Sequence, residues 1–468
     1  MQNLSNLDAA FIHLEKPSCP MHVGAILYFS AEDNRSITLT QLQEHLSPRI
    51  SAQPLFRQRL CAGRLGHYSW KEATDFSLNQ HIRSLTCPGP LTEESVDEVI
   101  TRFFAQALDR RFPLWELLLL KGDPDAPQVH RLKTSDEFAF VCLIKVHHAA
   151  VDGVSAESVI SALLDGLDST PATAVPGKAI EKTFRSRMQH FLHSADVLKD
   201  RISQELWRTL PYYTQAPVTP FAASDTLNRQ HIGITLSMTQ LQYIKKQRPG
   251  TTLNDVLLGV IGGALRHYLA AQEQLPQASL IALTPVSKRA TPQLPGGNQI
   301  SAMLIDLATE VTEPLERLKK VHENAVVAKI YNQKLQIENL FASLPHQLVA
   351  LTLKTWSSLR LSRKMPALFN VIVTNVPGSR NTLSLAGFPL QKMHGVAPIY
   401  DKHALTVVIV SYTDQVSIHV TCTRKSVTDP AALRLHLHAS MQAMLLACEA
   451  ETTPQTPAQQ DTVIVTAA

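Results

Sequence analysis

The sequence has little net charge and no long hydrophobic run, and each shortage excludes a class of protein. Lysine plus arginine (44) barely exceeds aspartate plus glutamate (40), which leaves a formal charge of +4 and does not favour nucleic-acid binding. No stretch of about 18 uncharged apolar residues occurs, so no membrane-spanning helix is expected. The first residues lack the basic start and apolar centre of a secretory signal. We therefore expect a cytoplasmic protein, with any membrane contact limited to peripheral attachment at the inner face.

Cysteine and the common nucleotide and nucleophile motifs are equally scarce. The six cysteines lie far apart and form no C-x-x-C pair, which indicates neither a zinc site nor a disulfide framework. No G-x-S-x-G occurs, because the stretch beginning at Gly153 ends in Glu157, and P-loop and dinucleotide fingerprints are absent. The sequence therefore predicts no metal and no bound cofactor.

The 468 residues exceed the length of one ordinary core and predict several domains. Strand-like and helix-like segments interleave on both sides of a region rich in proline and polar residues, which favours an α/β fold with a ligand cleft between two layers. The expected division is 1–167, an N-terminal domain; 168–231, a linker with a helical segment; 232–451, a C-terminal domain; and 452–468, a disordered tail.

Local patterns predict individual elements. Residues 21–29, 138–146, 369–374, 405–410 and 416–422 have the composition of strands. Between Ser95 and Arg110 apolar residues recur at helical spacing, and Ser95 with Glu98 has the form of a capping box.

Two adjacent histidines, His147 and His148, stand where the apolar run 138–146 ends, followed by Asp152 and Gly153. Side chains alternate along a strand, so the two rings are expected to face different surroundings. An imidazole is a suitable general base near neutral pH, and glycine permits a turn that a Cβ would strain. A capped turn without catalytic function is the competing interpretation. Metal binding is disfavoured, because neighbouring strand histidines diverge.

The spacing His147-His148-x-x-x-Asp152-Gly153 resembles the active-site motif of the CoA-dependent acyltransferase superfamily. The surrounding residues narrow the resemblance to the bacterial wax ester synthase/diacylglycerol acyltransferase family. The further matches follow the family's order: Leu4 to Phe11, Pro20 to Gly24, Pro113 to Glu116, Leu253 to Val256, Thr284 to Arg289, Gly297 to Gln299, and Asn370 to Gly378. Several short matches in one order are more specific than any single one.

The resemblance implies an α/β fold of two chloramphenicol-acetyltransferase-like domains, each a mixed sheet with flanking helices, with the active-site channel between them. It implies that His148 is the base, that His147 faces away from the channel and that Asp152 fixes the loop. Asn254 is expected to bond the histidine, the alcohol or the oxyanion, and Asp255 to cap a helix with Thr252. The remaining supporting residues are Gly153, Trp115, Asn375 and Gly378.

The reaction so implied moves a fatty acyl group from acyl-CoA to a long-chain alcohol or diacylglycerol, without a covalent intermediate. Cys142 is interpreted as a core residue rather than an acyl carrier. The segment from Leu340 to Trp356 is either a core-facing helix or a surface that docks on lipid. Two other interpretations stay open: a relative that takes acyl groups from a carrier protein, and a degenerate acyltransferase that only binds lipid or a partner.

Overall fold

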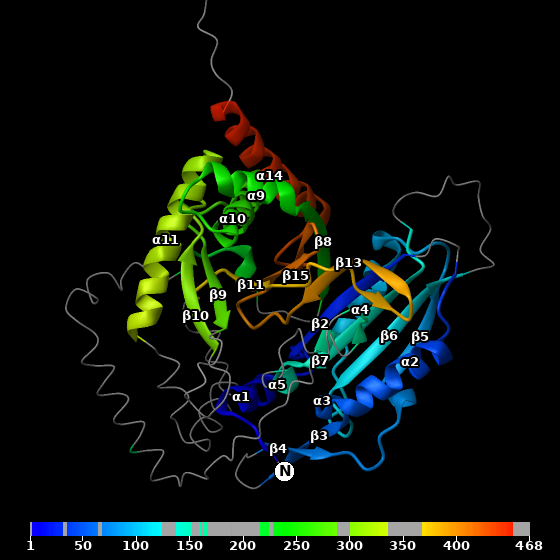
Figure 1. Cartoon of the computed structure of the whole chain (residues 1–468). Helices are drawn as coiled ribbons and strands as arrows, with labels where there is room; N and C mark the ends of the chain where they lie inside the picture. Colours follow the sequence, from blue (N-terminus) through cyan, green and yellow to red (C-terminus); the bar gives the residue numbers. More distant parts are fainter. Residues whose placement is uncertain are drawn as a thin grey trace, which may run out of the picture.

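The computed structural model describes residues 2–30, 35–63, 68–123, 137–151, 159–160, 163–166, 189, 216–223, 228–287, 300–335 and 367–452. These residues form two six-stranded mixed sheets with helices packed on them, and a small three-stranded sheet (Figure 1). The expected α/β class is therefore confirmed.

The first sheet has the strand order β12-β13-β2-β7-β6-β5, in which only β5 and β6 are parallel. In the central pair, His22 lies opposite His147 and Phe29 opposite Phe140. The strands are β2 (His22–Phe29), β5 (Ile82–Cys87), β6 (Trp115–Gly122), β7 (Phe140–His147), β12 (Ser384–Leu385) and β13 (Phe388–Val396).

Both faces of this sheet are covered, because alternate residues of its strands belong to two different cores. Leu27 of β2 packs with Phe56, on the side of α2 (Leu39–Ala52) and α3 (Pro54–Arg57). Its neighbour Ile26 packs with Phe104 of α4 (Glu93–Ala105), on the other side. Burial on both faces explains why 138–146 is apolar at every position except Lys145 rather than alternating.

The start of α4 differs from the expected one. Thr92 is the N-cap and forms the capping box with Ser95 at the third helical position, so the proposed pair of Ser95 and Glu98 is wrong. A threonine followed three residues later by a serine makes the same reciprocal bonds as the usual pair that ends in Glu or Gln. The helix therefore begins three residues earlier than the apolar spacing indicated.

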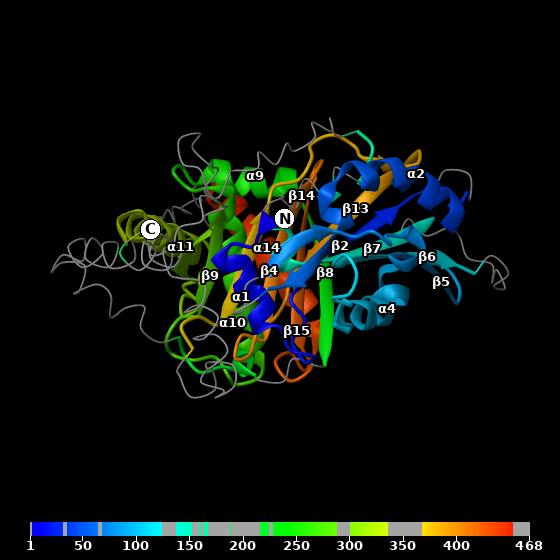
Figure 2. The same cartoon turned by 90° about the horizontal axis from the view of Figure 1, so that it is seen from below.

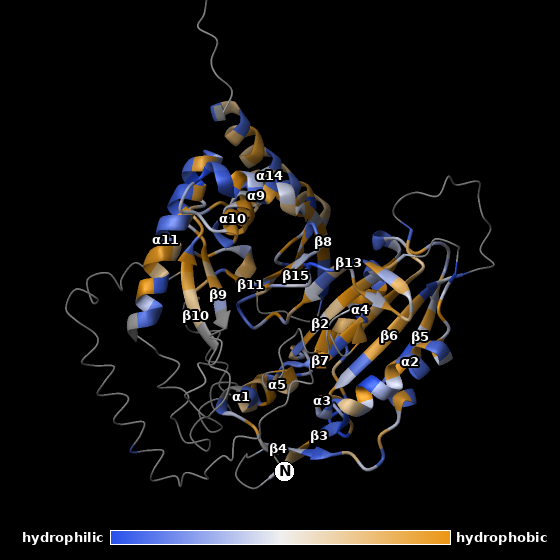
Figure 3. Cartoon of the chain, in the orientation of Figure 1, coloured by the Kyte–Doolittle hydropathy of each residue, from blue (hydrophilic) through white to orange (hydrophobic). Residues whose placement is uncertain are grey.

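The second sheet has the order β10-β9-β11-β14-β15-β8. Buried residues of α10 and α14 join those of β14 and β15 in one core, and strands of both sheets are largely hydrophobic (Figure 3). The elements are β8 (Arg229–Ser237), β9 (Ile281–Ser287), β10 (Ile300–Asp306), β11 (Val371–Val376), β14 (Leu405–Tyr412), β15 (Gln415–Thr423), α9 (Met238–Gln247), α10 (Leu253–Ala271), α11 (Pro314–Leu335) and α14 (Pro430–Thr452).

The small sheet and two helices lie near the end of β7 (Figures 1 and 2). Helix α1 (Asn6–Leu14) begins at the N-cap Ser5, which forms a capping box with Asp8, and it packs against the four-residue α5 (His148–Val151). The small sheet consists of β1 (Gln2–Asn3), β4 (Tyr68–Glu72) and β3 (Gln58–Ala62).

Strand β13 connects the two halves. It pairs with β2, although the chain reaches it only after most of the second sheet, and its face packs on β14 and β15. The Ser417 hydroxyl donates to the Met393 carbonyl at 2.5 Å, and the Tyr412 hydroxyl donates to the Leu390 carbonyl at 3.0 Å. Residues 384–396 thus belong to the sheet of the N-terminal half, and the division at 167, 231 and 451 stays a proposal.

Three buried histidines lie where the halves meet. His231 of β8 and His419 of β15 approach at 3.1 Å between Nδ1 and Nε2, and the His394 ring of β13 lies 5.5 Å from that of His419. Burial lowers the pKa of His231 to about 3, that of His394 to about 4, and that of His419 well below its usual value. Gly233 is required here, because a Cβ would lie 2.6 Å from His394 Cε1.

Candidate active site

The two adjacent histidines lie at the junction of β7 and α5. His147 is the last residue of the strand, and its N–H donates to the Leu114 carbonyl at 2.9 Å. His148 is the first residue of α5, and its N–H donates to the Met21 carbonyl at 2.8 Å. The backbone of both residues is thus fixed by the neighbouring segments. Asp152 and Gly153, the other two motif residues, lie outside the described residues.

His147 is fully buried and is held from two sides. The Ala149 N–H donates to its Nδ1 at 3.1 Å, so Nδ1 is the accepting nitrogen of the ring. That Nε2 lies 3.4 Å from Glu15 Oε1, and Glu15 is the residue that caps the C-terminus of α1. Nδ1 of His147 is thus occupied by a backbone donor and Nε2 lies beside a buried carboxylate, which suits a structural rather than a proton-transferring role.

Glu15 is a carboxylate shared by several groups around the histidines. Its Oε1 accepts the Met21 N–H at 3.2 Å, and its Oε2 accepts Arg110 Nη2 at 2.6 Å and Nε at 3.1 Å. Burial alone would raise its pKa, but His147 and Arg110 outweigh burial and lower the pKa to about 2. Glu15 is therefore a permanent anion that ties α1 to the strand carrying the histidines.

His148 has different surroundings. Its ring stacks on that of Phe11 in α1, with 3.8 Å between centroids and 19° between planes. The residue is partly exposed, although its Nδ1 is buried, and no hydrogen-bond partner for this atom occurs among the described residues. Burial lowers the pKa of His148 to about 4. At neutral pH the ring is uncharged and has a lone pair with which to accept a proton.

A second cluster of predicted residues lies at the start of α10. Thr252 caps the helix and forms the expected capping box with Asp255, whose carboxylate accepts the Thr252 N–H at 2.8 Å. The Asp255 carboxylate also lies 2.9 Å from His322 Nδ1 of α11. Asn254 precedes Asp255 in the helix, and its Oδ1 accepts a hydrogen bond from Nδ2 of Asn375 in β11 at 3.4 Å. The structure thus brings Asn254 and Asn375 together and fixes Asp255 within the helix cap.

Trp115 lies in the core next to the site. It is 1% exposed, its indole N–H donates to the Phe56 carbonyl at 2.9 Å, and its ring stacks on His81 at 4.6 Å. Its backbone pairs with Val146, the residue before His147. Trp115 therefore supports the end of β7 from within the sheet.

Gly378 lies just beyond β11, where the chain passes close to β14. A Cβ there would lie 2.0 Å from the Ser411 carbonyl oxygen, while the glycine N–H donates to the Ser411 hydroxyl at 3.2 Å. Gly378→Ala is expected to lower the free energy of unfolding by about 1 to 3 kcal/mol, the usual cost of forcing an atom into packed space. Urea unfolding followed by circular dichroism measures this change. Arg380→Ala, on the exposed part of the same loop, serves as the control, and equal losses in both variants would refute the steric argument.

The sequence did not predict a role in the site for four residues that organise it: Phe11, Glu15, Arg110 and His322. Phe11 closes the Leu4 to Phe11 match, but its stack with His148 joins positions far apart in the chain. Glu15 gave one usable signal, since an acidic residue at the C-terminal end of a helix is unfavourable for the helix dipole and needs a partner. Its partners, Arg110 and His147, follow only from the fold.

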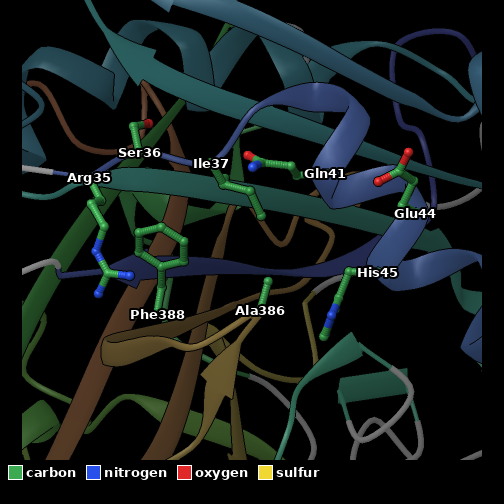
Figure 4. A pocket seen from close by; sticks show the side chains of 8 residues that line it. All are labelled: Arg35, Ser36, Ile37, Gln41, Glu44, His45, Ala386 and Phe388. Atoms are coloured by element: carbon green, nitrogen blue, oxygen red, sulfur yellow. The ribbon is translucent and has the colours of Figure 1, made fainter.

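A pocket of about 550 Å³ lies elsewhere, at the opposite end of β2 from His22 and the catalytic candidates. Figure 4 shows the side chains that line it. Its wall is mainly polar and includes His45, which lies 3.3 Å from Asp165. The lining residues are Arg35, Ser36, Ile37, Gln41, Glu44, His45, Ala386 and Phe388. None of the predicted site residues lines this pocket.

Comparison with known proteins identifies relatives along nearly the whole chain. Residues 4–257 match the wax ester synthase/diacylglycerol acyltransferase catalytic domain, and residues 296–445 match the C-terminal domain of the same family. A Mycobacterium tuberculosis protein assigned as a diacylglycerol O-acyltransferase is 29% identical over 94% of this chain and 99% of its own. An Acinetobacter baylyi O-acyltransferase, WSD, is 26% identical over 94% of this chain and 96% of its own.

Solved structures show the same relationship. The wax ester synthase/diacylglycerol acyltransferase from Marinobacter aquaeolei has a TM-score of 0.68 and 25% identity, covering 96% of this chain and all of that one. The starter condensation domain of rhizomide synthetase has a TM-score of 0.53 at 14% identity, covering 97% of this chain and 95% of that one, and this similarity concerns the fold alone.

Proposed function

Since the chain belongs to the wax ester synthase/diacylglycerol acyltransferase family and is an acyltransferase, we propose that it moves a fatty acyl group from acyl-CoA to a long-chain alcohol or diacylglycerol. The products are a wax ester or a triacylglycerol. The observation that carries this proposal is the His148 imidazole, which is neutral, partly exposed and fixed at the end of β7.

In the proposed step, Nε2 of His148 accepts the proton of the alcohol hydroxyl while the oxygen attacks the thioester carbonyl. Breakdown of the tetrahedral intermediate breaks the carbon–sulfur bond, and the imidazolium returns the proton to the departing thiolate, giving ester and free CoA. Nδ1 is the less suitable nitrogen, because it is buried. A thioester is already activated, so the step needs neither an enzyme nucleophile nor a cofactor. Cys142 is 1% exposed, and burial raises its pKa, which supports its exclusion as a carrier.

The other residues take supporting roles in this proposal. Asn254, with its oxygen engaged by Asn375, presents its NH₂ group to the substrate or the oxyanion. His147 and Asp255 fix the backbone on which His148 and Asn254 stand. Asp152, Gly153, Trp115 and Gly378 shape the surrounding loops and core.

Contact with a lipid surface is a further part of the proposal, because both acceptors and products partition into hydrocarbon. Val326, Val327 and Ile330 of α11 are 41 to 46% exposed on one stretch of helix, which supports such a contact. The segment from Leu340 to Trp356, proposed from the sequence, lies outside the described residues. Among the helices that the structure describes, none has both the length and the apolar character to cross a bilayer.

The test is an assay of free thiol released from palmitoyl-CoA in the presence of hexadecanol, a panel of shorter alcohols or diacylglycerol, with the lipid product identified by mass spectrometry. We expect thiol release to depend on the acceptor and to match ester formation one to one. Turnover only with an acylated carrier protein would favour the carrier-dependent alternative. Lipid binding without any turnover would indicate a degenerate acyltransferase.

A further inference from the structure

Helix α1 and its C-cap residue Glu15 contact both histidines of the motif, from positions one helical turn apart. Phe11 stacks on His148, and Glu15, four residues later, lies 3.4 Å from His147 Nε2. Residues at this spacing share one face of a helix. Phe11 and the C-cap Glu15, whose N–H donates to the Phe11 carbonyl, therefore lie on the same side of α1 and meet both rings at the end of β7.

Four further hydrogen bonds hold this helix and its C-cap residue in place against the strand. Glu15 Oε1 accepts the Met21 N–H, and the Met21 carbonyl in turn accepts the His148 N–H at 2.8 Å. From the other side, Arg110 binds Glu15 and also donates to the Ile12 carbonyl at 3.1 Å. Because α1 is anchored at several points, the position of the Phe11 ring against His148 is set by the fold and not by the two side chains alone.

The stack itself restricts the imidazole. Aromatic pairs usually have their centroids 4.5 to 7 Å apart, whereas here the centroids are 3.8 Å apart and the planes are nearly parallel. The phenyl ring therefore covers one face of the imidazole, limits its rotation and keeps water from that face.

We propose that Phe11 is a positioning residue for the acyl transfer, holding the His148 ring in the orientation in which its free nitrogen meets the acceptor hydroxyl. This inference rests on the proposed function of His148 as the base. It differs from simple core packing, because it ties Phe11 to the orientation and the protonation of one ring. Misplacing a catalytic group by about 1 Å costs on the order of a hundredfold in rate.

The experiment compares Phe11→Ala, Phe11→Leu and Phe11→Tyr with the parent enzyme in the thiol-release assay from pH 4 to 9. In Phe11→Ala water reaches the ring, so the acidic limb of kcat/KM is expected to move up by about one pH unit or more toward the ordinary histidine value. Its kcat is expected to fall at least about tenfold, with KM changed less than about threefold. Phe11→Leu still keeps water from the His148 ring but removes the flat phenyl face that orients it. We therefore expect kcat to fall without an upward shift of the acidic limb of kcat/KM. Phe11→Tyr retains both properties and is expected to stay close to the parent.

A matched control exists in the same chain. Phe369 stacks on His403 with the same centroid distance of 3.8 Å and 17° between planes, and burial also lowers the pKa of His403 to about 4. Phe369→Ala should leave kcat and the acidic limb unchanged. If Phe11→Ala fails to fold, Phe11→Leu against Phe11→Tyr decides the question.

The outcomes separate this inference from the function on which it rests. If Phe11→Ala and Phe11→Leu both keep the parental kcat and pH profile while His148→Ala is inactive, the positioning role is wrong and the base stands. If His148→Ala is itself active, the base assignment fails first. A rise in KM with kcat unchanged would show that Phe11 contributes only to substrate binding, and it would overturn the proposal.

Discussion

Replacing His148 by alanine is expected to reduce thiol release from palmitoyl-CoA and hexadecanol by about a hundredfold to ten-thousandfold, the contribution of a positioned general base. The loss should fall on kcat, because the ring acts on the proton of the reacting hydroxyl and not on the hydrocarbon chains. The structure supports a selective effect, since His148 is partly exposed and its backbone N–H bond to Met21 does not depend on the side chain.

The controls for this variant come from the neighbouring residue. His147→Gln removes a ring whose Nδ1 accepts the Ala149 N–H and whose Nε2 lies beside Glu15. We therefore expect it to lower the free energy of unfolding as well as the activity, whereas His148→Ala should unfold close to the parent. Activity of His148→Ala within about tenfold of the parent would refute the base assignment, because even the weakest general base contributes more.

The second large effect is a loss of stability in acid, caused by the three histidines between the halves. Burial lowers the folded-state pKa of His231 to about 3 and that of His394 to about 4, and it lowers the pKa of His419 well below its usual value, whereas an unfolded histidine titrates near 6.5. Below pH 6.5 the unfolded chain thus binds more protons, so the free energy of unfolding falls as the pH drops from about 6.5 toward 4. Above about pH 7 this contribution to stability is fully present.

The size of the effect is measured by difference, because other buried histidines contribute to the same slope. His394→Gln removes one of the three titrating rings, and its free energy of unfolding should fall less steeply than that of the parent, by up to about 1.4 kcal/mol per pH unit.

The charged and titratable groups around the cluster come from α4, β13, α14, β8 and β2: Glu93, Asp97, Lys392, Arg434, Arg229 and Tyr28.

Urea unfolding at a series of pH values between 4 and 8 provides the measurement, with His45→Gln on α2, a partly exposed position, as the control. If the free energy of unfolding falls with pH at the same rate in the parent and in His394→Gln, the cluster does not control acid stability. If the pH dependence of the free energy of unfolding is reduced in His45→Gln and not in His394→Gln, the acid sensitivity comes from residues outside the cluster.

Local features were predicted well because their causes are local. The strand before His147 followed from its apolar run, and the Thr252 and Asp255 cap from a spacing of three residues. The α/β class followed from interleaved strand and helix patterns and from the family resemblance. The start of α4 was missed because a serine fills the third helical position in place of the usual glutamate.

The contacts that organise the site depend on pairings between distant segments, which one sequence does not display. The stack of Phe11 on His148 requires α1 to cross the end of β7, and the approach of Asn375 to Asn254 requires β11 to end near the start of α10. The same holds for β13, which was not among the predicted strands and whose partner β2 lies far away in the sequence. The motif residues were identifiable by type and order, and their anchors were not.

The pairing of β13 with β2 also affects how the chain folds during its synthesis. During synthesis from the N-terminus, β2 and β7 leave the ribosome long before residues 388–396, so one edge of the first sheet stays open until β13 has been made. An open edge is a template for pairing with another chain, which makes the nascent N-terminal half prone to aggregation. Fragments that end before residue 384 should therefore need a chaperone to remain in solution.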